Sequence, residues 1–183
     1  MTLLADVLCT RVRALDEDAL VETYDRYSPE LYRYAFRLLG DAQLAEECVA
    51  EAFSRLLQAL RNGGGPRQYL RAYLYRIAHN WVTDHYRRKS FSTLPLDARI
   101  PSDEGEEPSR ALSEEMERQQ VRQALAKLTP EQRQVIVLRY LEGWELSDIS
   151  LAMNKPVGAV KALQHRALNS LRRLLAQAEE IVL

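Results

Sequence analysis

The sequence contains few cysteines, glycines and prolines and no long hydrophobic run, and each shortage excludes a class of protein. Two cysteines, Cys9 and Cys48, are too few for a disulfide framework or a four-cysteine zinc site. No apolar run approaches the roughly 20 residues that a membrane-spanning helix needs, so we expect no membrane insertion. The segment after Met1 lacks a basic region and is interrupted by Asp6, unlike a signal peptide. We therefore expect a soluble, cytoplasmic protein.

The charged residues are balanced in number but unevenly placed. The 183 residues include 25 Lys and Arg and 26 Asp and Glu, a formal net charge of -1, with 46% hydrophobic residues. This length allows one domain or two small ones. Residues 52–89 and 149–178 are strongly basic, whereas residues 91–120 are strongly acidic. Because local charge decides what a surface attracts, the pattern predicts two basic surfaces separated by an acidic segment.

Helical spacing of apolar residues recurs along the chain, and no strand-like alternation is found. We expect Ser28-Pro29 to divide the segment 16–39 into two helices, with Gly40 ending the second and Asp41 capping the next. Thr129-Pro130-Glu131-Gln132 has the pattern of a capping box with proline in the first turn. The other helices are expected at 41–60, 67–89, 129–141, 145–153 and 156–178. The sequence therefore predicts an all-α fold.

Two segments rich in glycine, proline or acidic residues interrupt the helices. Residues 62–66, Asn-Gly-Gly-Gly-Pro, form a break between two helices. Residues 91–112 contain three prolines and the run Asp103-Glu104-Gly105-Glu106-Glu107, which indicates an acidic, flexible linker. A solvated tether and a segment with a docking role are both compatible with it. We expect two small helical domains at 1–90 and 113–183.

The C-terminal part has the pattern of a helix-turn-helix. The short helix 145–153 is followed by Asn154-Lys155-Pro156, in which asparagine tolerates left-handed geometry and proline suits the start of a helix. Apolar residues of the next helix form one buried stripe that includes Val160, Leu163 and Ala167. The polar and small residues off that stripe are typical of a helix that enters the major groove. An amphipathic helix of an ordinary bundle is the alternative.

Three motifs resemble the extracytoplasmic-function sigma factors, which are group-four RNA polymerase sigma factors of the sigma-70 family. The segment 128–140, Leu-Thr-Pro-Glu-Gln-Arg-Gln-Val-Ile-Val-Leu-Arg-Tyr, with the helix-turn-helix after it, resembles their domain four. The segment 73–89 resembles the promoter-melting helix of their domain two. The segment 45–53, Ala-Glu-Glu-Cys-Val-Ala-Glu-Ala-Phe, resembles their polymerase-binding helix. The motifs occur in the family's order and cover nearly all of residues 16–176.

The resemblance implies a function for each domain. Domain four would read the minus-35 promoter element as duplex DNA, and domain two would hold the minus-10 element as a single strand. The implied minus-35 residues are Lys155, Pro156, Val157, Gly158, Ala159, Lys161, Ala162, Gln164, His165 and Arg166. The implied minus-10 residues are Asn62, Gly63, Gly64, Gly65, Arg67, Tyr73, Arg76, Asn80, Arg87, Arg88 and Lys89.

The resemblance also implies protein partners. They are core RNA polymerase, through the clamp of its beta-prime subunit and the flap of its beta subunit, and an anti-sigma factor. Glu47, Glu51 and Arg55 would contact the polymerase. No cofactor, metal ion or catalytic residue is expected.

The residues of the minus-10 helix suit a single-stranded ligand. Arginine side chains can neutralise phosphates, and aromatic rings offer flat faces for unstacked bases. The aromatic candidates are Tyr73, Tyr75, Trp81 and Tyr86, although core packing is the stronger expectation for Trp81. In the family, the loop that matches residues 62–67 receives a flipped base. A plain flexible turn is the alternative for these residues.

The sequence departs from the family pattern at several positions. Glu145 and Asn154 stand where the family usually has Ser and Gly, and Ala50 replaces a usual polymerase-facing Gln. A base-reading arginine is absent near Leu163, and Gln164 replaces it. Because glutamine pairs well with adenine, the minus-35 element is expected to differ from the family's commonest one.

The sequence fits three other functions less well. An enzyme is disfavoured because the potential cluster His79, Asp84 and His85 does not converge on one helix face, and no phosphate loop or metalloprotease motif is present. A helix-turn-helix regulator with an N-terminal interaction domain would leave the basic helix 67–89 and the acidic face of 41–60 unexplained. A structural adaptor of the polymerase would bind the enzyme without opening promoters.

Overall fold

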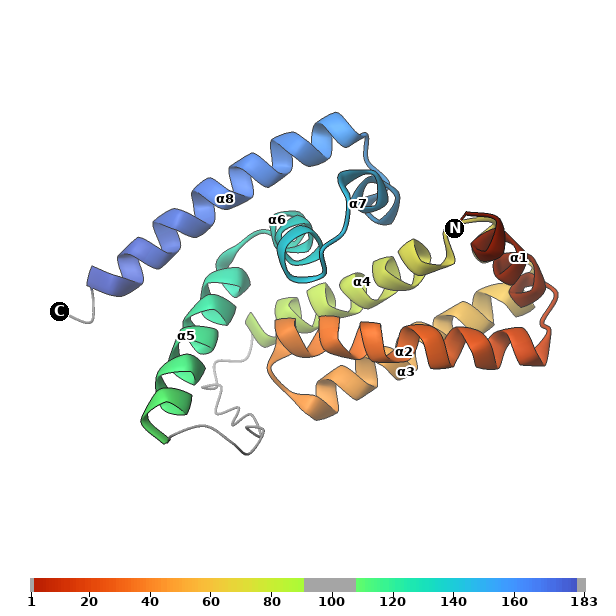
Figure 1. Cartoon of the computed structure of the whole chain (residues 1–183), viewed down its shortest axis with the longest axis horizontal. Coiled ribbons are helices and arrows are strands. Elements are labelled where there is room, and N and C mark those ends of the chain that lie inside the picture. The colour runs from red at the N-terminus through yellow and green to blue at the C-terminus, as the bar shows by residue number, and fades with distance from the viewer. Residues whose placement is uncertain (1, 91–107, 181–183) are drawn as a thin grey trace.

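The computed structural model of the chain describes residues 2–90 and 108–180. Every regular element in these ranges is a helix, so the predicted all-α class is confirmed. In chain order they are α1 (Thr2–Arg13), α2 (Glu17–Leu39), α3 (Ala42–Arg61), α4 (Leu70–Ser90), α5 (Pro108–Lys127), α6 (Pro130–Ile136), the π-helical turn η1 (Val137–Leu141), α7 (Leu146–Met153) and α8 (Val157–Glu180) (Figure 1). We refer to α1–α4 as the N-terminal domain and to α5–α8 as the C-terminal domain. Residues 91–107, most of the predicted linker, lie outside the described ranges.

Helix α2 is continuous through Pro29, so the expected division into two helices was wrong. A proline inside a helix removes one backbone hydrogen bond and crowds the preceding turn. However, Tyr27 and Leu31 on either side of Pro29 are both buried in the same core, and the proline itself is exposed. Continuous packing of one face therefore outweighs the local disturbance.

The helix ends near residue 40 are as predicted, but the start of α4 is not. Gly40 has a left-handed φ of 69° and ends α2, and the carboxylate of Asp41 accepts a hydrogen bond of 2.9 Å from the backbone N–H of Leu44. Helix α4 begins at Leu70 rather than at the predicted residue 67. The reason is that Tyr69 has a φ of 57°, a conformation that cannot continue a right-handed helix.

The C-terminal domain contains the predicted capping box and an unpredicted wide turn. Thr129 and Gln132 each accept a hydrogen bond from the other's backbone N–H. Helix α6 then passes into η1, where the N–H of Glu142 donates to the carbonyl of Val137. The chain after this turn carries Trp144 into the interior, where its exposed fraction is 3%. Helix α5 begins at Pro108, before the predicted domain start at residue 113, and proline suits a first helical turn.

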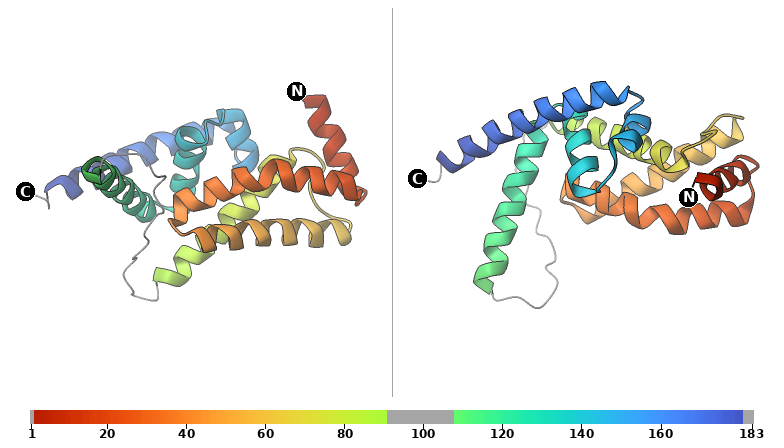
Figure 2. Two further views of the ribbon diagram at one scale, coloured as in Figure 1. Left: turned by 60° about the horizontal axis from the view of Figure 1, so that its bottom comes forward. Right: turned by 45° about the horizontal axis from the view of Figure 1, so that its top comes forward.

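The two domains pack against each other, and α4 lies between them (Figures 1 and 2). Helix α4 contacts α2 and α3 on one side and α7 on the other, and α2 also contacts α5. Buried apolar residues of both domains form one contiguous cluster. Within the described ranges, no helix combines the length and apolar character that spanning a membrane requires.

Candidate nucleic-acid interface

The turn between α7 and α8 is held by several short-range hydrogen bonds. Asn154 has the predicted left-handed conformation, with φ 52° and ψ 47°. The N–H of Lys155 donates to the carbonyl of Ser150 at 3.0 Å, and the hydroxyl of Ser150 donates back to the carbonyl of Lys155 at 2.5 Å. The carbonyl of Pro156 accepts the first hydrogen bond of α8. The predicted helix-turn-helix is therefore present.

Helix α8 buries one stripe and exposes most of the predicted minus-35 residues. Val160, Leu163 and Ala167 are buried against α5, α6 and α7. The exposed candidates are Pro156, Val157, Gly158, Ala159, Lys161, Ala162, His165 and Arg166. This face carries two positive charges and several small residues, so a duplex can approach it closely.

Two minus-35 candidates are held by neighbouring residues. The ammonium group of Lys155 lies 3.0 Å from the carboxylate of Glu131. The side-chain amide of Gln164 donates a hydrogen bond of 2.7 Å to the hydroxyl of Tyr140, which comes from η1 and is exposed. In the sequence, Tyr140 is the last residue of the segment 128–140 and is not among the implied DNA-binding residues. No local signal pairs residues 140 and 164, because their contact depends on how α8 packs across η1.

Helix α4 presents the predicted minus-10 residues to different degrees. Asn80, Arg87 and Arg88 are exposed, and Arg87 lies 3.1 Å from the carboxylate of Asp84. Tyr73 and Arg76 are half-buried, with the guanidinium of Arg76 5.6 Å from the ring centre of Tyr73. The side chain of Lys89 lies outside the described part of the chain.

Two aromatic residues expected to face bases instead contact other residues at the domain interface, where one is buried and the other is half-buried. Tyr75 has an exposed fraction of 1%, and Tyr86 is half-buried and carries the guanidinium of Arg133 4.0 Å from its ring centre. The expectation that these two rings offer flat faces to bases is therefore wrong for this arrangement. Trp81 is half-buried and stacks on His85 with ring centroids 5.7 Å apart.

The loop at 62–66 has defined backbone geometry. Gly63 and Gly65 have left-handed φ values of 73° and 88°, and the N–H of Gly64 donates to the carbonyl of Ala59 at 2.8 Å. Glycine is favoured at position 65 because residues with a side chain rarely adopt its φ, and a Cβ atom there would lie 2.9 Å from a methyl group of Leu60. The loop is therefore a hydrogen-bonded turn in this structure, and its role in receiving a base stays a prediction.

The loop borders a cavity of about 340 Å3. The predicted minus-10 residues Gly65, Arg67, Tyr73 and Arg76 are among those that line it. Leu151 and Asn154 of the C-terminal domain complete the lining. The domain that carries the helix-turn-helix thus covers part of the surface predicted to receive a base.

The predicted polymerase-binding residues lie along the exposed side of α3. Glu47 is exposed, and the carboxylate of Glu51 accepts a hydrogen bond of 2.7 Å from Arg55, four residues later. The opposite side of α3 is buried through Ala45 and Ala52. Glu47, Glu51 and Arg55 therefore form an acidic row on the accessible face of α3, in which Arg55 partly neutralises the negative charge.

The three residues considered as a catalytic cluster have separate partners. His79 is buried, and its Nδ1 lies 2.8 Å from the hydroxyl of Tyr34. Burial, reinforced by the positive charge of Arg133, lowers the pKa of His79 to about 3. His85 stacks on an aromatic ring and Asp84 pairs with an arginine, as described above. In the described ranges, no group of three His, Cys, Asp or Glu residues is placed to hold a metal ion.

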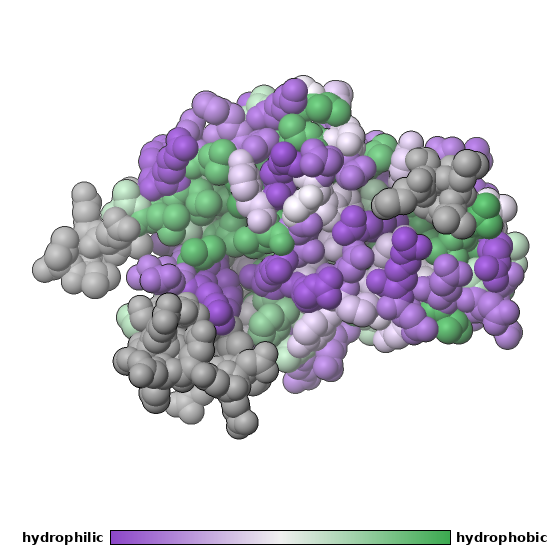
Figure 3. All heavy atoms as spheres, viewed as in Figure 1, coloured by the Kyte–Doolittle hydropathy of each residue, from purple (hydrophilic) through white to green (hydrophobic). Residues whose placement is uncertain are grey.

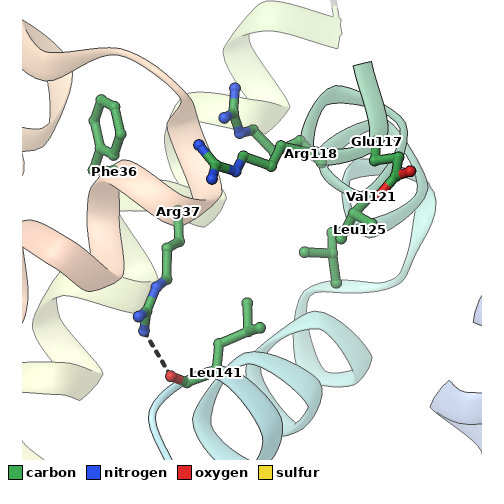
Figure 4. A pocket seen from close by; sticks show the side chains of 8 residues that line it. Phe36, Arg37, Glu117, Arg118, Val121, Leu125 and Leu141 are labelled. Atoms are coloured by element: carbon green, nitrogen blue, oxygen red, sulfur yellow. Dashed lines mark hydrogen bonds between the residues drawn. The ribbon is translucent and has the colours of Figure 1, made fainter. Parts of the chain in front are cut away.

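The interface between the domains combines aromatic rings with arginines. The guanidinium of Arg71 in the N-terminal domain lies 4.3 Å from the ring centre of Trp144. Arg37 pairs with Glu142 and also donates a hydrogen bond of 2.6 Å to the carbonyl of Leu141, at the edge of a cavity of about 670 Å3 between α2, α5 and η1 (Figure 4). The two domains are therefore held together by specific contacts.

Comparison with known protein families assigns both domains. Residues 23–91 match the family described as Sigma-70 region 2, and residues 124–173 match Sigma-70, region 4. Helices α2–α4 thus correspond to the first match. The end of α5 and the helices up to most of α8 correspond to the second.

Similar proteins support the same assignment. The chain is 31% identical to the ECF RNA polymerase sigma factor BldN of Streptomyces coelicolor, over 92% of this chain and 64% of BldN. It is 31% identical to SigW of Bacillus subtilis and 32% identical to SigL of Mycobacterium tuberculosis, in both cases over 90% of this chain and 93% of the relative.

Two solved structures have a similar fold. The structure of CnrH in complex with the cytosolic domain of CnrY has a TM-score of 0.69 at 22% identity, over 94% of this chain and 97% of CnrH. The sigma factor RpoE of Bartonella quintana, in complex with the anti-sigma factor NepR, has a TM-score of 0.60 at 21% identity, over 85% of this chain and 95% of RpoE. The chain belongs to the extracytoplasmic-function (ECF) sigma factors of the sigma-70 family, which direct RNA polymerase to specific promoters.

Proposed function

We propose that this sigma factor reads a promoter with two separate surfaces, α8 on the minus-35 duplex and α4 with the loop 62–67 on the single-stranded minus-10 element. The observation that carries the proposal is the exposure of both predicted surfaces on different domains. Lys161 and Arg166 project from α8, and Asn80, Arg87 and Arg88 project from α4. Each surface combines cations for phosphates with groups that can contact a base edge.

The amide of Gln164 is the group on α8 best suited to read a base. Glutamine can donate to and accept from adenine in the major groove. The hydroxyl of Tyr140 already accepts one amide hydrogen and so fixes the direction of the side chain. Tyr140 therefore takes part in minus-35 reading by orienting Gln164.

The part of the cavity wall that the N-terminal domain supplies is the proposed place for an extruded minus-10 base. Leu151 and Asn154 of the C-terminal domain close this cavity in the packed arrangement, and separation of the domains would open it to a base. Arg67 and Arg76 supply positive charge beside it, and the ring of Tyr73 supplies an aromatic wall. The side-chain amide of Asn80, one helical turn after Arg76 on the same face of α4, is exposed and can contact a neighbouring base.

Polymerase contacts are assigned to two further surfaces. Glu47 and Glu51 on α3 would meet the clamp of the beta-prime subunit. In Figure 3 apolar side chains gather between α5 and α8. Leu171 and Leu174 of α8 are half-buried. An apolar surface of this kind suits the flap of the beta subunit.

Promoter binding requires the domains to separate. Elements at minus-35 and minus-10 are about 25 base pairs, or ~85 Å, apart along straight duplex. Domains in direct contact cannot occupy both. We infer that the packed arrangement is the unbound state, held in the cytoplasm until core polymerase binds. An anti-sigma factor, such as the one bound to RpoE of Bartonella quintana, is a proposed partner of this state.

Transcription reconstituted with core polymerase tests the proposal. We expect transcripts whose mapped 5′ ends share minus-35 and minus-10 elements. The variant Lys161→Glu/Arg166→Glu should lose transcription that depends on the minus-35 element. The control Arg172→Glu/Arg173→Glu, which reverses two exposed charges further along α8, should retain most of it. Duplex binding without initiation would indicate a helix-turn-helix regulator, and polymerase binding without initiation would indicate an adaptor.

A further inference from the structure

Helix α1 lies outside both matched family segments, yet it is firmly packed in the N-terminal domain. Leu8, Cys9 and Val12 are buried, with exposed fractions of 4%, 0% and 0%. At the end of α1, the guanidinium of Arg11 lies 2.9 Å from the carboxylate of Asp16, which also caps the start of α2. The position of α1 is therefore fixed relative to α2.

One contact joins α1 to the loop that precedes α4. The thiol of Cys9 donates a hydrogen bond to the carbonyl oxygen of Pro66 at 3.3 Å, across 57 residues of sequence. Pro66 is buried, and because proline has no N–H, this carbonyl is its only backbone hydrogen-bonding group. Helix α1 thus contacts the loop at a backbone atom directly before Arg67.

The loop is consequently held from two sides. On its first side, the N–H groups of Gly63 and Gly64 donate to carbonyls in the last turn of α3. On its second side, Cys9 holds Pro66. Between these anchors lies Gly65, whose left-handed φ glycine adopts without strain.

We propose that α1 is a positioning element for minus-10 reading and that Cys9 is its point of action on the loop. The proposal rests on the proposed function of the loop 62–67. A binding site discriminates among ligands only when its groups are held close to the productive geometry. By fixing Pro66, Cys9 fixes the exposed residue that follows it, Arg67, relative to Tyr73 and Arg76, which line the same cavity. Without this anchor the loop would sample several conformations and discriminate less among bases.

Amide hydrogen exchange of the full-length protein tests whether Cys9 holds the loop. In Cys9→Ala we expect exchange across residues 62–69 to increase about threefold or more, the effect of losing one modest hydrogen bond. The control is Cys48→Ala, which removes the other buried thiol of the domain, 3.7 Å from the carbonyl of Ala78 and in contact with α4 rather than the loop. Cys9→Ser, which retains a donor, should restore part of the protection. Equal loop exchange in wild type and Cys9→Ala would overturn the proposal.

Transcription from a set of minus-10 variants tests whether this support matters for reading. With core polymerase, Cys9→Ala should lower the ratio between the preferred and the disfavoured base by about threefold, whereas Cys48→Ala should change total activity without changing the ratio. An unchanged ratio in Cys9→Ala would also overturn the proposal. Exchange of residues 62–65 for another loop distinguishes a failure of the role proposed for Cys9 from a failure of the base reading proposed for the loop. If that exchange leaves base preference unchanged, the function proposed for the loop is itself wrong.

Discussion

The indole ring of Trp144 packs against the phenol ring of Tyr75 with ring centroids 4.6 Å apart and an interplanar angle of 60°. The two residues belong to different family segments, since Tyr75 lies in the region 2 match and Trp144 in the region 4 match. The hydroxyl of Tyr75 also donates to the carboxylate of Glu142 at 3.4 Å. The aromatic face that suggested base stacking in the sequence therefore serves to join the two domains.

Replacing Trp144 with alanine should separate the domains. The change removes the ring contacts with Tyr75 and Arg71, and truncating a buried tryptophan costs about 3–5 kcal/mol. We expect a larger radius of gyration in small-angle X-ray scattering and faster assembly with core polymerase. The control is Trp81→Ala, because Trp81 stacks on His85 of its own helix. A radius that matches wild type would show that other contacts are sufficient to hold the closed arrangement.

The stability of the N-terminal domain should fall in mild acid because of His79. Its pKa is lowered to about 3 by burial, with a further contribution from Arg133, whereas an unfolded histidine titrates near 6.5. Between these values the unfolded chain binds a proton that the folded chain does not. Stability is therefore full above pH ~6.5 and decreases as the pH falls towards ~3, by about 2 kcal/mol at pH 5.

Urea unfolding at several pH values checks this linkage. His79→Gln can keep a hydrogen bond to Tyr34 and removes the titrating group, so its stability should depend less on pH between 7.5 and 5. His165→Gln, at an exposed position, should retain the wild-type dependence. If the free energy of unfolding depends on pH in the same way in wild type and His79→Gln, His79 is not the source of the acid sensitivity.

The helices could be predicted because their signals are local. Gly40, Asp41 and the Thr129 capping box mark boundaries through contacts with near neighbours. The continuous passage through Pro29 and the late start of α4 could not be predicted in the same way. Packing of the stripe around Pro29 outweighs its local preference, and the left-handed conformation of Tyr69 is unusual for an aromatic residue.

The acidic row on α3 should contribute to polymerase binding. Reversal of both charges in Glu47→Lys/Glu51→Lys should weaken capture of core polymerase without unfolding the domain, because both side chains face solvent at least in part. Circular dichroism checks the fold and a pull-down measures binding. Asp18→Lys/Asp25→Lys, at two exposed positions of α2, is the matched control. If the two double variants bind equally, α3 is not the clamp contact.

Tyr140 and Gln164 should act as one unit in minus-35 reading. Gln164→Ala should reduce discrimination at one base pair by about 1–3 kcal/mol, the value of one good base contact. Tyr140→Phe removes the hydroxyl that accepts from Gln164 and should have a smaller effect in the same direction. Because the two share one contact, the double variant should lose less than the sum. Additive losses in transcription from minus-35 variants would show that Tyr140 does not orient Gln164.

Sequence patterns predicted which helix faces could bind DNA. They did not predict which side chains on those faces are already in contact with residues elsewhere in the chain. A helical pattern places Asn80, Lys161 and Arg166 on polar faces, and the structure exposes all three. It cannot show that Tyr86 is covered by Arg133, because that contact joins two domains. Contacts between residues far apart in sequence leave no periodic signal.

Asn80 should determine base preference at the minus-10 element, and Arg87 and Arg88 should not. All three side chains are exposed on α4, but an amide can distinguish base edges, whereas guanidinium groups bound to phosphates cannot. Asn80→Ala should therefore cost about 1–3 kcal/mol of discrimination between minus-10 variants. It should leave capture of core polymerase unchanged, because α3 is a different element. Arg87→Ala and Arg88→Ala should weaken opening of all promoters alike and reduce its salt dependence.

Abortive transcription from a set of minus-10 variants measures both effects in one assay. The ratio among promoters reports base reading, and the mean rate reports phosphate binding. The competing explanation is that Asn80 only solvates the surface of α4, in which case Asn80→Ala would keep both the ratio and the rate of wild type. Asn169→Ala is the matched control, since Asn169 is exposed on α8 and its amide lies 3.4 Å from His165. A change in minus-10 preference in this control would mean that the assay does not resolve the two elements, whereas a change only in Asn80→Ala would assign base reading to α4.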